Sequence, residues 1–306
     1  MSAASGTAPV MVASDLDRTL IYSANSMALS GSDHLAPRMV VAEVYDAAPL
    51  SFMTRAAEEL LEGIVERSVF VPVTTRTQAQ FSRVRLPGFG RGYAVTTNGA
   101  VLLHDGEPDA DWSRHIRRSL GECAPLAEVL GHLTGSAADP AVLRVRTAED
   151  YFVYSIVDRQ ALPDAYLDEL SAWCAARGWT TSLQGRKLYC VPASITKEAA
   201  VQEVRRRSGS GLLVAAGDSR LDAGILELAD IAIRPSHGEL DSDSFTRPNL
   251  TVTSASGMMA GEEILRFVGD VLAQAADPAA LTRLPAAAPA AAPGEPWSGP
   301  VAAVPR

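Results

Sequence analysis

Residues 10–23 read VMVASDLDRTLIYS, an apolar run that ends in two aspartates one residue apart. Residues 10–13 predict a buried strand, in which successive side chains point to opposite faces. Asp15 and Asp17 follow the carboxyl end of this strand, the edge at which open α/β sheets bind ligands. Neighbouring carboxylates repel each other, so such a pair usually holds a cation or divides acid and base roles. Because the triplet Asp-Leu-Asp also occurs by chance in surface turns, the rest of the chain has to decide between the two interpretations.

Three further segments place polar residues after an apolar run or at the start of a helical pattern: Thr74 after VFVPV, Lys197 in SITKEAAV, and Asp218 and Asp222 after LLVAA. Ser194 or Thr196 is expected to cap the helix that begins near Lys197. The crevice of a doubly wound, mostly parallel Rossmann-like sheet collects such groups at the ends of its strands. With Asp15 and Asp17, they supply the acids, the hydroxyl and the ammonium that phosphoryl transfer with a hard metal ion needs.

The order DLDRTL, VTTR, TK and GDSRLD resembles the haloacid dehalogenase (HAD) superfamily of aspartate-nucleophile phosphohydrolases. The resemblance extends over about residues 10–268. Asn98-Gly99-Ala100, after the strand-like YAVTT, resembles the segment that precedes the cap in the Cof-like and sucrose-phosphatase-like branch with type II caps. The resemblance implies an α/β fold with an inserted α/β cap domain.

The sequence departs from the family pattern at three positions. Arg18 and Thr75 stand where many relatives carry glycine, and Leu221 stands where many carry asparagine. None of these departures removes a reacting group. They do leave the identity of the substrate open.

The resemblance implies separate roles for the two aspartates of the first motif. Asp15 is the expected nucleophile, because a carboxylate that forms an aspartyl-phosphate splits one hard displacement into two easier ones. Asp17 is the expected general acid, which protonates the leaving alkoxide and then activates the hydrolytic water. The sequence itself shows only the pair.

The resemblance also implies a Mg²⁺ site beside these residues. Asp15, the backbone carbonyl of Asp17 and Asp218 are the expected ligands, a set that matches the preference of Mg²⁺ for a few carboxylates, waters and phosphate oxygens. Asp222 either binds the metal directly or, as we expect, holds Lys197 or a water beside it. Thr74 is expected to donate to the transferring phosphoryl group, and Lys197 to place its charge on the phosphoryl oxygens.

Lysine is rare in this chain. Only Lys187 and Lys197 occur, so arginine supplies nearly all the positive charge of the surface. A lysine at the motif position is therefore hard to explain as surface decoration, and its compact ammonium suits close approach to phosphate. Lys187 lies on a predicted hairpin of the cap and is a weaker candidate for contact with substrate.

The pattern of segments predicts four parts. Residues 1–101 and 191–275 are expected to form the catalytic core, residues 102–190 an α/β cap, and residues 276–306 a disordered tail rich in Ala and Pro. Within the cap, the predicted elements are strands at residues 141–147 and 151–157, a helix over residues 162–178 and a hairpin that turns at Gln184-Gly185. Within the core, residues 39–45 predict a strand and residues 50–67 a helix with Thr54 as a plausible cap.

Composition narrows the class of function and location. The net charge of −9 argues against a nucleic acid or an anionic membrane as partner. The three cysteines form no Cys-x-x-Cys pair, so we expect neither disulfide nor zinc, and a reducing cytoplasm. No window offers about 18 unbroken apolar residues, and no transmembrane segment is expected. The five histidines lack metal-ligand spacing and are expected to be surface or structural residues, although His34 and His237 lie near loops that could face the site.

These patterns favour a Mg²⁺-dependent phosphatase that hydrolyses a small phosphate monoester, such as a sugar phosphate or a similar polar metabolite. A phosphomutase of the same superfamily shares the acid pair and the cap, and sequence does not separate the two. A non-enzymatic phospho-acceptor or ligand-binding module also combines acids, a threonine and a lysine on a doubly wound sheet. Asp17 argues against that module, because a signal needs no second carboxylate placed to hydrolyse it. The oligomeric state stays open.

Overall fold

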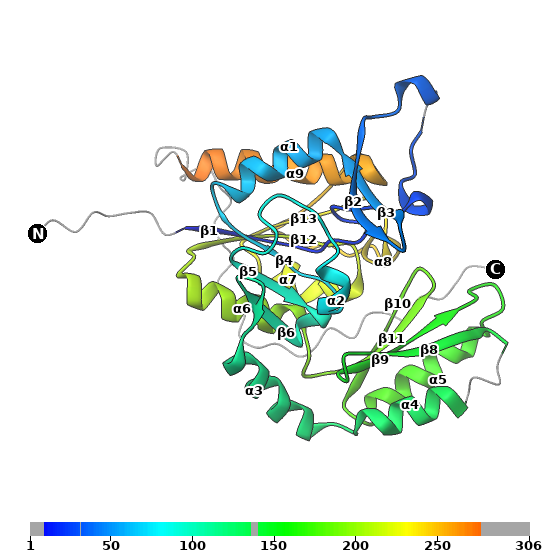
Figure 1. Cartoon of the computed structure of the whole chain (residues 1–306). Coiled ribbons are helices and arrows are strands. Elements are labelled where there is room, and N and C mark those ends of the chain that lie inside the picture. The colour runs from blue at the N-terminus through cyan, green and yellow to red at the C-terminus, as the bar shows by residue number, and fades with distance from the viewer. Residues whose placement is uncertain (1–8, 31, 136–139, 277–306) are drawn as a thin grey trace, which may run out of the picture. The chain divides into compact units, whose positions relative to one another are not determined.

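The computed structural model describes residues 9–30, 32–135 and 140–276 (Figure 1). The chain forms two compact units. Unit 1 comprises Met1–Val71, Val84–Phe89 and Gln202–Arg306, as far as those residues are described, and unit 2 comprises Pro72–Arg83 and Gly90–Val201. Unit 2 is thus larger than the predicted cap, because it also contains the segments around Thr74 and Asn98. The division into a catalytic core and a cap stays a prediction, and all but the first residue of the predicted tail lies outside the described residues.

Unit 1 is built on a five-stranded sheet in the order β14-β13-β12-β1-β4. Its strands are β1 Val10–Ser14, β4 Val69–Pro72, β12 Leu212–Ala216, β13 Ile231–Arg234 and β14 Leu250–Val252. β1 pairs in parallel with β12, from Val10 opposite Leu212 to Ser14 opposite Ala216. β12 and β13, and β13 and β14, also pair in parallel. The predicted α/β fold with a mostly parallel sheet is confirmed, and β1 and β12 end at the same edge.

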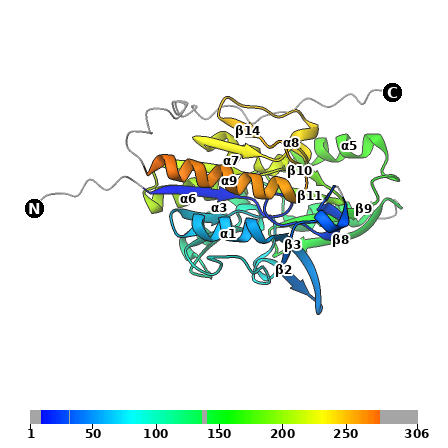
Figure 2. The ribbon, with the colours of Figure 1, turned by 90° about the horizontal axis from the view of Figure 1, so that it is seen from above.

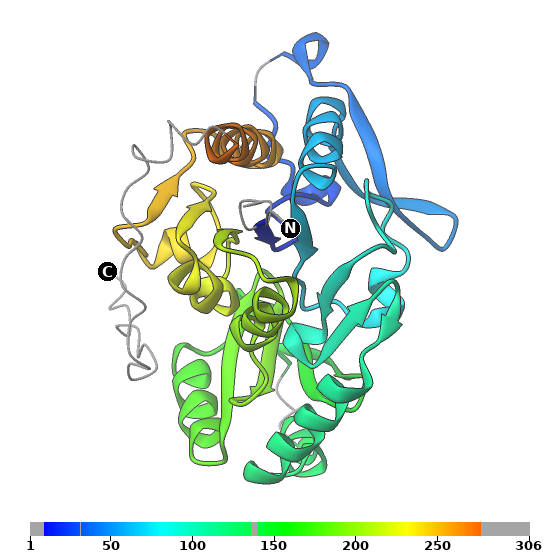
Figure 3. The ribbon, with the colours of Figure 1, turned by 90° about the vertical axis from the view of Figure 1, so that its left-hand side faces the viewer.

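Helices cover this sheet, with bounds α1 Arg55–Val65, α7 Ala223–Leu228, α8 Glu239–Ser242 and α9 Met258–Ala275. α1 and α9 lie side by side in the views of Figures 2 and 3. The hydroxyl of Thr54 accepts a hydrogen bond from the Ala57 N–H at 3.0 Å and donates to Glu262 Oε2 at 2.9 Å. Thr54 therefore caps α1, as predicted, and ties it to α9.

A two-stranded hairpin precedes α1, formed by β2 Met39–Tyr45 and β3 Ala48–Thr54. The strand predicted over residues 39–45 is confirmed. The helix predicted over residues 50–67 starts only at Arg55, because residues 50–54 pair with β2 instead. The apolar residues Leu50, Phe52 and Met53 do not distinguish a strand from the first turn of a helix, and the pairing with β2 decides between them. No helix among residues 9–30, 32–135 and 140–276 combines the length and the apolar character needed to cross a bilayer.

Unit 2 contains a four-stranded antiparallel sheet in the order β10-β11-β9-β8. Its elements are α4 Leu126–Gly135, β8 Val142–Ala148, β9 Phe152–Val157, α5 Asp164–Ala175, β10 Trp179–Gln184 and β11 Lys187–Pro192. The predicted strands, helix and hairpin are all present. The hairpin turns one residue later than predicted, at Gly185-Arg186, because Gln184 pairs with Lys187. Gly185 takes the positive φ of +56° that this tight turn needs.

The rest of unit 2 is a smaller sheet with short helices: α2 Gln78–Phe81, β5 Tyr93–Thr96, β6 Val101–His104, β7 Glu107–Pro108 and α3 Ala110–Ser119. α6 Lys197–Ser208 begins in unit 2 and ends in unit 1. Gly99 follows β5 with a φ of +100°, and a Cβ placed there would lie 2.1 Å from the Thr196 carbonyl oxygen. This glycine lets the segment after β5 pack directly on the start of α6.

Candidate active site

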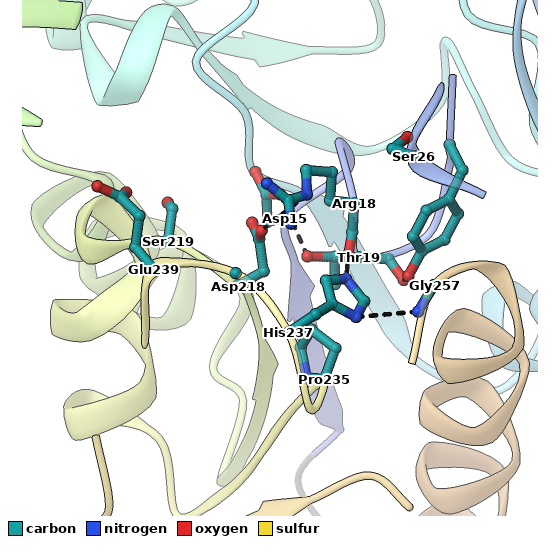
Figure 4. A network of polar contacts seen from close by, with 12 residues as sticks. Asp15, Arg18, Thr19, Ser26, Asp218, Ser219, Pro235, His237, Glu239 and Gly257 are labelled. Carbon is teal, nitrogen blue, oxygen red and sulfur yellow. Dashed lines mark hydrogen bonds and ion pairs between the residues drawn. The ribbon is translucent and has the colours of Figure 1, made fainter. Parts of the chain in front are cut away.

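Three buried aspartates meet at the carboxyl edge of the sheet in unit 1. The Asp15 N–H donates to the Ala216 carbonyl at 2.9 Å, which continues the parallel pairing of β1 and β12 beyond both strands. Asp218 and Asp222 follow β12, and one ligand atom from each of Asp15, Asp218 and Asp222 lies within 4.8 Å of the others. Their exposed fractions are only 5%, 6% and 0%. The parallel register thus brings together three of the four acids that the sequence singled out, and Figure 4 shows Asp15 and Asp218 facing each other.

Asp222 organises the loop that carries Asp218. Its Oδ2 accepts hydrogen bonds from the Asp218 N–H at 3.2 Å, the Ser219 N–H at 2.9 Å and the Ser219 hydroxyl at 2.7 Å. Gly217 makes room for this turn, since a Cβ there would lie 2.3 Å from the Asp222 Cβ. One carboxylate oxygen of Asp222 is therefore committed to the loop, while the residue stays within the acid group.

Asp17 lies two residues after the nucleophile candidate, in a tight loop. The loop closes on itself through the Arg18 N–H, which donates to the Ile21 carbonyl at 2.8 Å, and through the Thr19 N–H, which donates to the Leu16 carbonyl at 3.2 Å. Asp17 is half-buried and, among the described acids, does not belong to the group of three. The Asp17 side chain is therefore more exposed than that of Asp15, and such a difference in surroundings is what different roles for the two residues require.

Arg18 has a left-handed backbone, with a φ of +65°. Glycine, which many members of the superfamily that the motif resembles carry at this position, would adopt this conformation without strain. The arginine present here places its Nε 3.6 Å from Asp218 Oδ2, with 40% of its side chain exposed. Arg18 therefore adds a positive charge beside the three acids. The sequence showed only that an arginine replaces a glycine here and did not predict this ion pair.

His237 is a second residue whose place at the site the sequence did not establish. Its Nδ1 accepts a hydrogen bond from the Gly257 N–H at 3.1 Å, so the proton is on Nε2, which donates to the Arg18 carbonyl oxygen at 2.8 Å (Figure 4). Burial lowers the pKa of His237 below its ordinary value. This neutral ring links the loop after β13 to the loop of Asp17. The sequence contains no residue spacing that would predict this contact, because both partners of His237 are backbone groups.

Tyr22 packs edge-on against His237, with ring centroids 6.0 Å apart. Its hydroxyl donates to the Thr19 carbonyl at 3.2 Å, and the Thr19 hydroxyl donates to Asp15 Oδ2 at 3.3 Å. Burial raises the pKa of Tyr22 well above its usual value, and the charges of Asp218 and Asp15 raise it further. Tyr22 therefore stays a protonated donor and supports the residue that orients the Asp15 carboxylate.

Thr74 and Lys197, the two predicted phosphate-binding residues, belong to unit 2. Thr74 is fully buried; its N–H donates to the Val95 carbonyl at 2.8 Å, and its hydroxyl accepts from the Arg76 N–H at 3.2 Å. Lys197 begins α6 and is 1% exposed. Their approach to the three acids of unit 1 stays a prediction.

The start of α6 is held from two sides. Of the two residues expected to cap it, Thr196 does so, because its hydroxyl accepts from the Ala199 N–H at 3.3 Å. The side chain of Asn98 donates from Nδ2 to the Ile195 carbonyl at 3.2 Å. The Asn98-Gly99 segment, which the sequence marked only by resemblance, therefore fixes the position from which Lys197 projects.

No protein-family model and no curated protein sequence matches this chain. Solved structures do match. The sucrose-phosphatase of Synechocystis sp. PCC6803, solved with sucrose and phosphate, shares 15% identity over 86% of this chain and 98% of its own, with a TM-score of 0.59. A sugar phosphatase of HAD subclass IIB shares 13% identity over 86% and 99%, with a TM-score of 0.53.

A trehalose-6-phosphate phosphatase related protein shares 16% identity over 86% of this chain and 99% of its own, with a TM-score of 0.51. At such low identity, the likeness establishes the fold. The chain has the fold of the HAD phosphatases, including that of the sucrose-phosphatase-like branch that its motifs resemble.

Proposed function

We propose that the protein is a Mg²⁺-dependent phosphatase that hydrolyses a small phosphate monoester through an aspartyl-phosphate on Asp15. The observation that carries this proposal is the buried group of Asp15, Asp218 and Asp222 at the edge of a sheet with the HAD phosphatase fold. Buried acids are rarely assembled without a cation or a proton-transfer role, because their charges repel in a poorly solvated place.

The reaction has two displacement steps. An Asp15 carboxylate oxygen attacks phosphorus, the bond to the leaving oxygen breaks, and Asp17 donates a proton to that oxygen. Asp17 then takes a proton from water, whose oxygen attacks the aspartyl-phosphate and releases inorganic phosphate and the free carboxylate. The hydrogen bond from Thr19 to Asp15 Oδ2 supports the first step, because it fixes the plane of the attacking group.

The acid group fits a divalent metal. Asp15, the backbone carbonyl of Asp17 and Asp218 would hold Mg²⁺, with Asp222 keeping the Asp218 loop in place through Ser219. The ion, when bound, neutralises the acids and the phosphate oxygens and so favours the negative charge of the transition state. Gly238 contributes space to this arrangement, since a Cβ there would lie 2.7 Å from Asp218 Oδ2.

Thr74 and Lys197 are proposed to bind the oxygens of the transferring phosphoryl group. A lysine that is 1% exposed carries a large desolvation cost unless an anion or a carboxylate compensates it. In the proposed complex, the oxygens of the phosphoryl group accept hydrogen bonds from this ammonium group.

We propose residues 102–190 as the cap that excludes water and selects the substrate. The solved structures of similar fold are named as a sucrose-phosphatase, a trehalose-6-phosphate phosphatase related protein and a sugar phosphatase, which supports a small phosphorylated metabolite as the substrate here. Cys123, Cys174 and Cys190 are free thiols, which suits the reducing cytoplasm proposed as the location.

A phosphate-release assay on a panel of phosphorylated metabolites tests the function. We expect release of inorganic phosphate with Mg²⁺, no release in excess EDTA, and recovery when Mg²⁺ is added back. Formation of an isomeric sugar phosphate without free phosphate would instead identify a phosphomutase. Full activity in chelator would disprove the metal assignment, and no turnover of any phosphate monoester would disprove the function.

A further inference from the structure

The four-stranded sheet of unit 2 has a face that α4 and α5 do not cover. The opposite face contacts α5, as the 2.5 Å hydrogen bond between the Thr181 and Ser171 hydroxyls shows. Strand register defines which residues share the other face, in three rows across the strands: Arg144, Ile156, Lys187 and Gln184; Arg146, Tyr154, Tyr189 and Ser182; and Ala148, Phe152, Val191 and Thr180. We call this surface the basic face.

The charge of the basic face is of one sign. Arg144, Arg146 and Lys187 lie on it and are exposed, whereas β8, β9, β10 and β11 contain no aspartate or glutamate. Within the described part of the chain, neither Arg144 nor Arg146 forms an ion pair. The exposed guanidinium groups of Arg144 and Arg146 therefore favour an anionic ligand.

Aromatic side chains provide a platform beside these cations. The Tyr154 and Tyr189 ring centroids lie 5.8 Å apart, and Phe152 meets Tyr189 edge-on at 6.1 Å. Tyr189 is 5% exposed and Phe152 is fully buried, so the platform is held firmly by packing. Tyr154, which is only half-buried, can contact the carbon skeleton of a small metabolite, and its hydroxyl offers a hydrogen bond.

A narrow pocket within unit 2 joins this platform to the segment after Thr74. Thr75 and Arg76 line it from one side, and Tyr154, Lys187 and Tyr189 line it from the other. Gln184, the cross-strand neighbour of Lys187, has a buried Nε2 with no hydrogen-bond partner. A buried donor without a partner is costly, so an acceptor from a ligand would relieve it. The pocket thus connects the segment that follows Thr74 to the Tyr154 and Lys187 side chains of the basic face.

We propose that the basic face selects phosphate monoesters whose leaving group carries a second anionic group, either a carboxylate or a further phosphate. This inference rests on the proposed function, because it places the leaving group next to the phosphoryl group that Thr74 binds. Arginine and lysine side chains only donate, whereas the hydroxyls of a neutral sugar also need acceptors. The charged residues of the face therefore fit an anion better than a neutral polyol.

Equilibrium binding to the catalytically disabled Asp15→Asn chain, measured by calorimetry, tests this inference apart from turnover. Two matched pairs of probes are used: 3-phosphoglycerate with glycerol 3-phosphate, and fructose 1,6-bisphosphate with fructose 6-phosphate. The first pair isolates a carboxylate and the second a further phosphate. In one of the two pairs, we expect the probe with the second anionic group (the anionic probe) to bind about tenfold more tightly than the probe whose leaving group is uncharged (the neutral probe). The pair that shows the preference identifies the anion.

The double substitution Arg144→Gln with Arg146→Gln should remove most of this preference and leave the affinity for the neutral probe nearly unchanged. Arg118→Gln is the matched control, because Arg118 is exposed on α3 and donates to a backbone carbonyl of its own helix. The control should keep the full preference. A preference that survives the double substitution overturns the inference, and so does the absence of any preference, including a failure of both anionic probes to bind.

The outcomes separate the inference from the function on which it rests. If the wild-type chain hydrolyses neutral and anionic monoesters equally well and the binding preference is absent, the inference fails and the phosphatase stands. If the preference is present and depends on Arg144 and Arg146, while no monoester is hydrolysed, anion recognition stands and the phosphatase fails.

Discussion

The Nε2 atom of His237 lies 2.8 Å from the carbonyl oxygen of Arg18, which joins the loop after β13 to the loop of the proposed general acid. The same ring accepts from the Gly257 N–H, so only the neutral form makes both hydrogen bonds. Arg18 holds a left-handed backbone at a position where glycine would be unstrained. We infer that His237 stabilises this strained loop, and that its protonation weakens the support.

The first prediction concerns the pH dependence of stability. Burial depresses the pKa of His237 in the folded state, so the unfolded state binds more protons. The contribution is complete above about pH 6.5, the ordinary pKa of histidine, and is lost as the pH falls through the window below it. When the pH is lowered from above about 6.5 into this window, the free energy of unfolding measured with urea should fall less for His237→Gln than for the wild type. His34→Gln, at an exposed position, should behave as the wild type. Equal pH dependence in all three proteins would contradict this role.

The second prediction concerns Gly238, whose φ is +97° and whose added Cβ would lie 2.5 Å from the Asp218 carbonyl oxygen. Gly238→Ala should raise the Mg²⁺ concentration needed for half-maximal activity, because it displaces a proposed ligand. Gly106→Ala is the control, since Gly106 has a φ of +84° and open space at its Cβ. Both variants strain the backbone, but only Gly238→Ala should change the Mg²⁺ requirement. An unchanged requirement in both would remove Asp218 from the metal site.

The third prediction distinguishes the two roles of Asp222. If its carboxylate mainly holds the Asp218 loop, Asp222→Asn should keep most of the affinity for Mg²⁺, because an amide oxygen can still accept from Ser219. Asp222→Ala should lose both Mg²⁺ affinity and thermal stability. Mg²⁺ titrations of activity on the two variants measure the difference. An asparagine variant as impaired in Mg²⁺ affinity as the alanine variant would show that Asp222 binds the metal directly.

The fourth prediction concerns the chain after α9. Truncation after Asp277 removes a segment rich in Ala and Pro, which offers few side chains for a core. The melting temperature and the turnover of small substrates should stay close to those of the full chain. A large fall in melting temperature would show that this segment docks on the folded protein.

The sequence correctly predicted those strands and helices whose own residues show a clear apolar pattern. β1 and β12 are unbroken apolar runs, and their parallel pairing follows from the α/β pattern, so the meeting of Asp15 and Asp218 could be predicted. Residues 50–54 could not be assigned correctly, because their pairing with β2 outweighs the helical period of the residues that follow. The same applies to the hairpin turn, whose exact position depends on register.

Interactions with backbone groups were not predictable. His237 binds the carbonyl of Arg18 and the N–H of Gly257, two groups that every residue type offers, so no residue pattern marks the contact. The ion pair between Arg18 and Asp218 depends on the left-handed backbone of Arg18, which sequence shows only as the loss of a glycine. Gly99 was singled out only because the Asn98-Gly99-Ala100 segment resembles the superfamily. The structure gives the physical reason for a glycine there, because the Thr196 carbonyl leaves no room for a Cβ.

The most direct test of the aspartyl-phosphate mechanism is the pre-steady-state release of nitrophenol from nitrophenyl phosphate by Asp17→Asn. Loss of proton transfer typically costs about 10²–10⁴-fold, but nitrophenolate leaves without a proton, so the first step is spared while dephosphorylation lacks its base. We predict a burst of about one nitrophenol per active site, then slow turnover, with a phosphoryl group found on Asp15 by mass spectrometry; Asp15→Asn should show neither. Activity retained by Asp15→Asn, or equal loss of aryl and alkyl turnover in both variants without a burst, would contradict the mechanism.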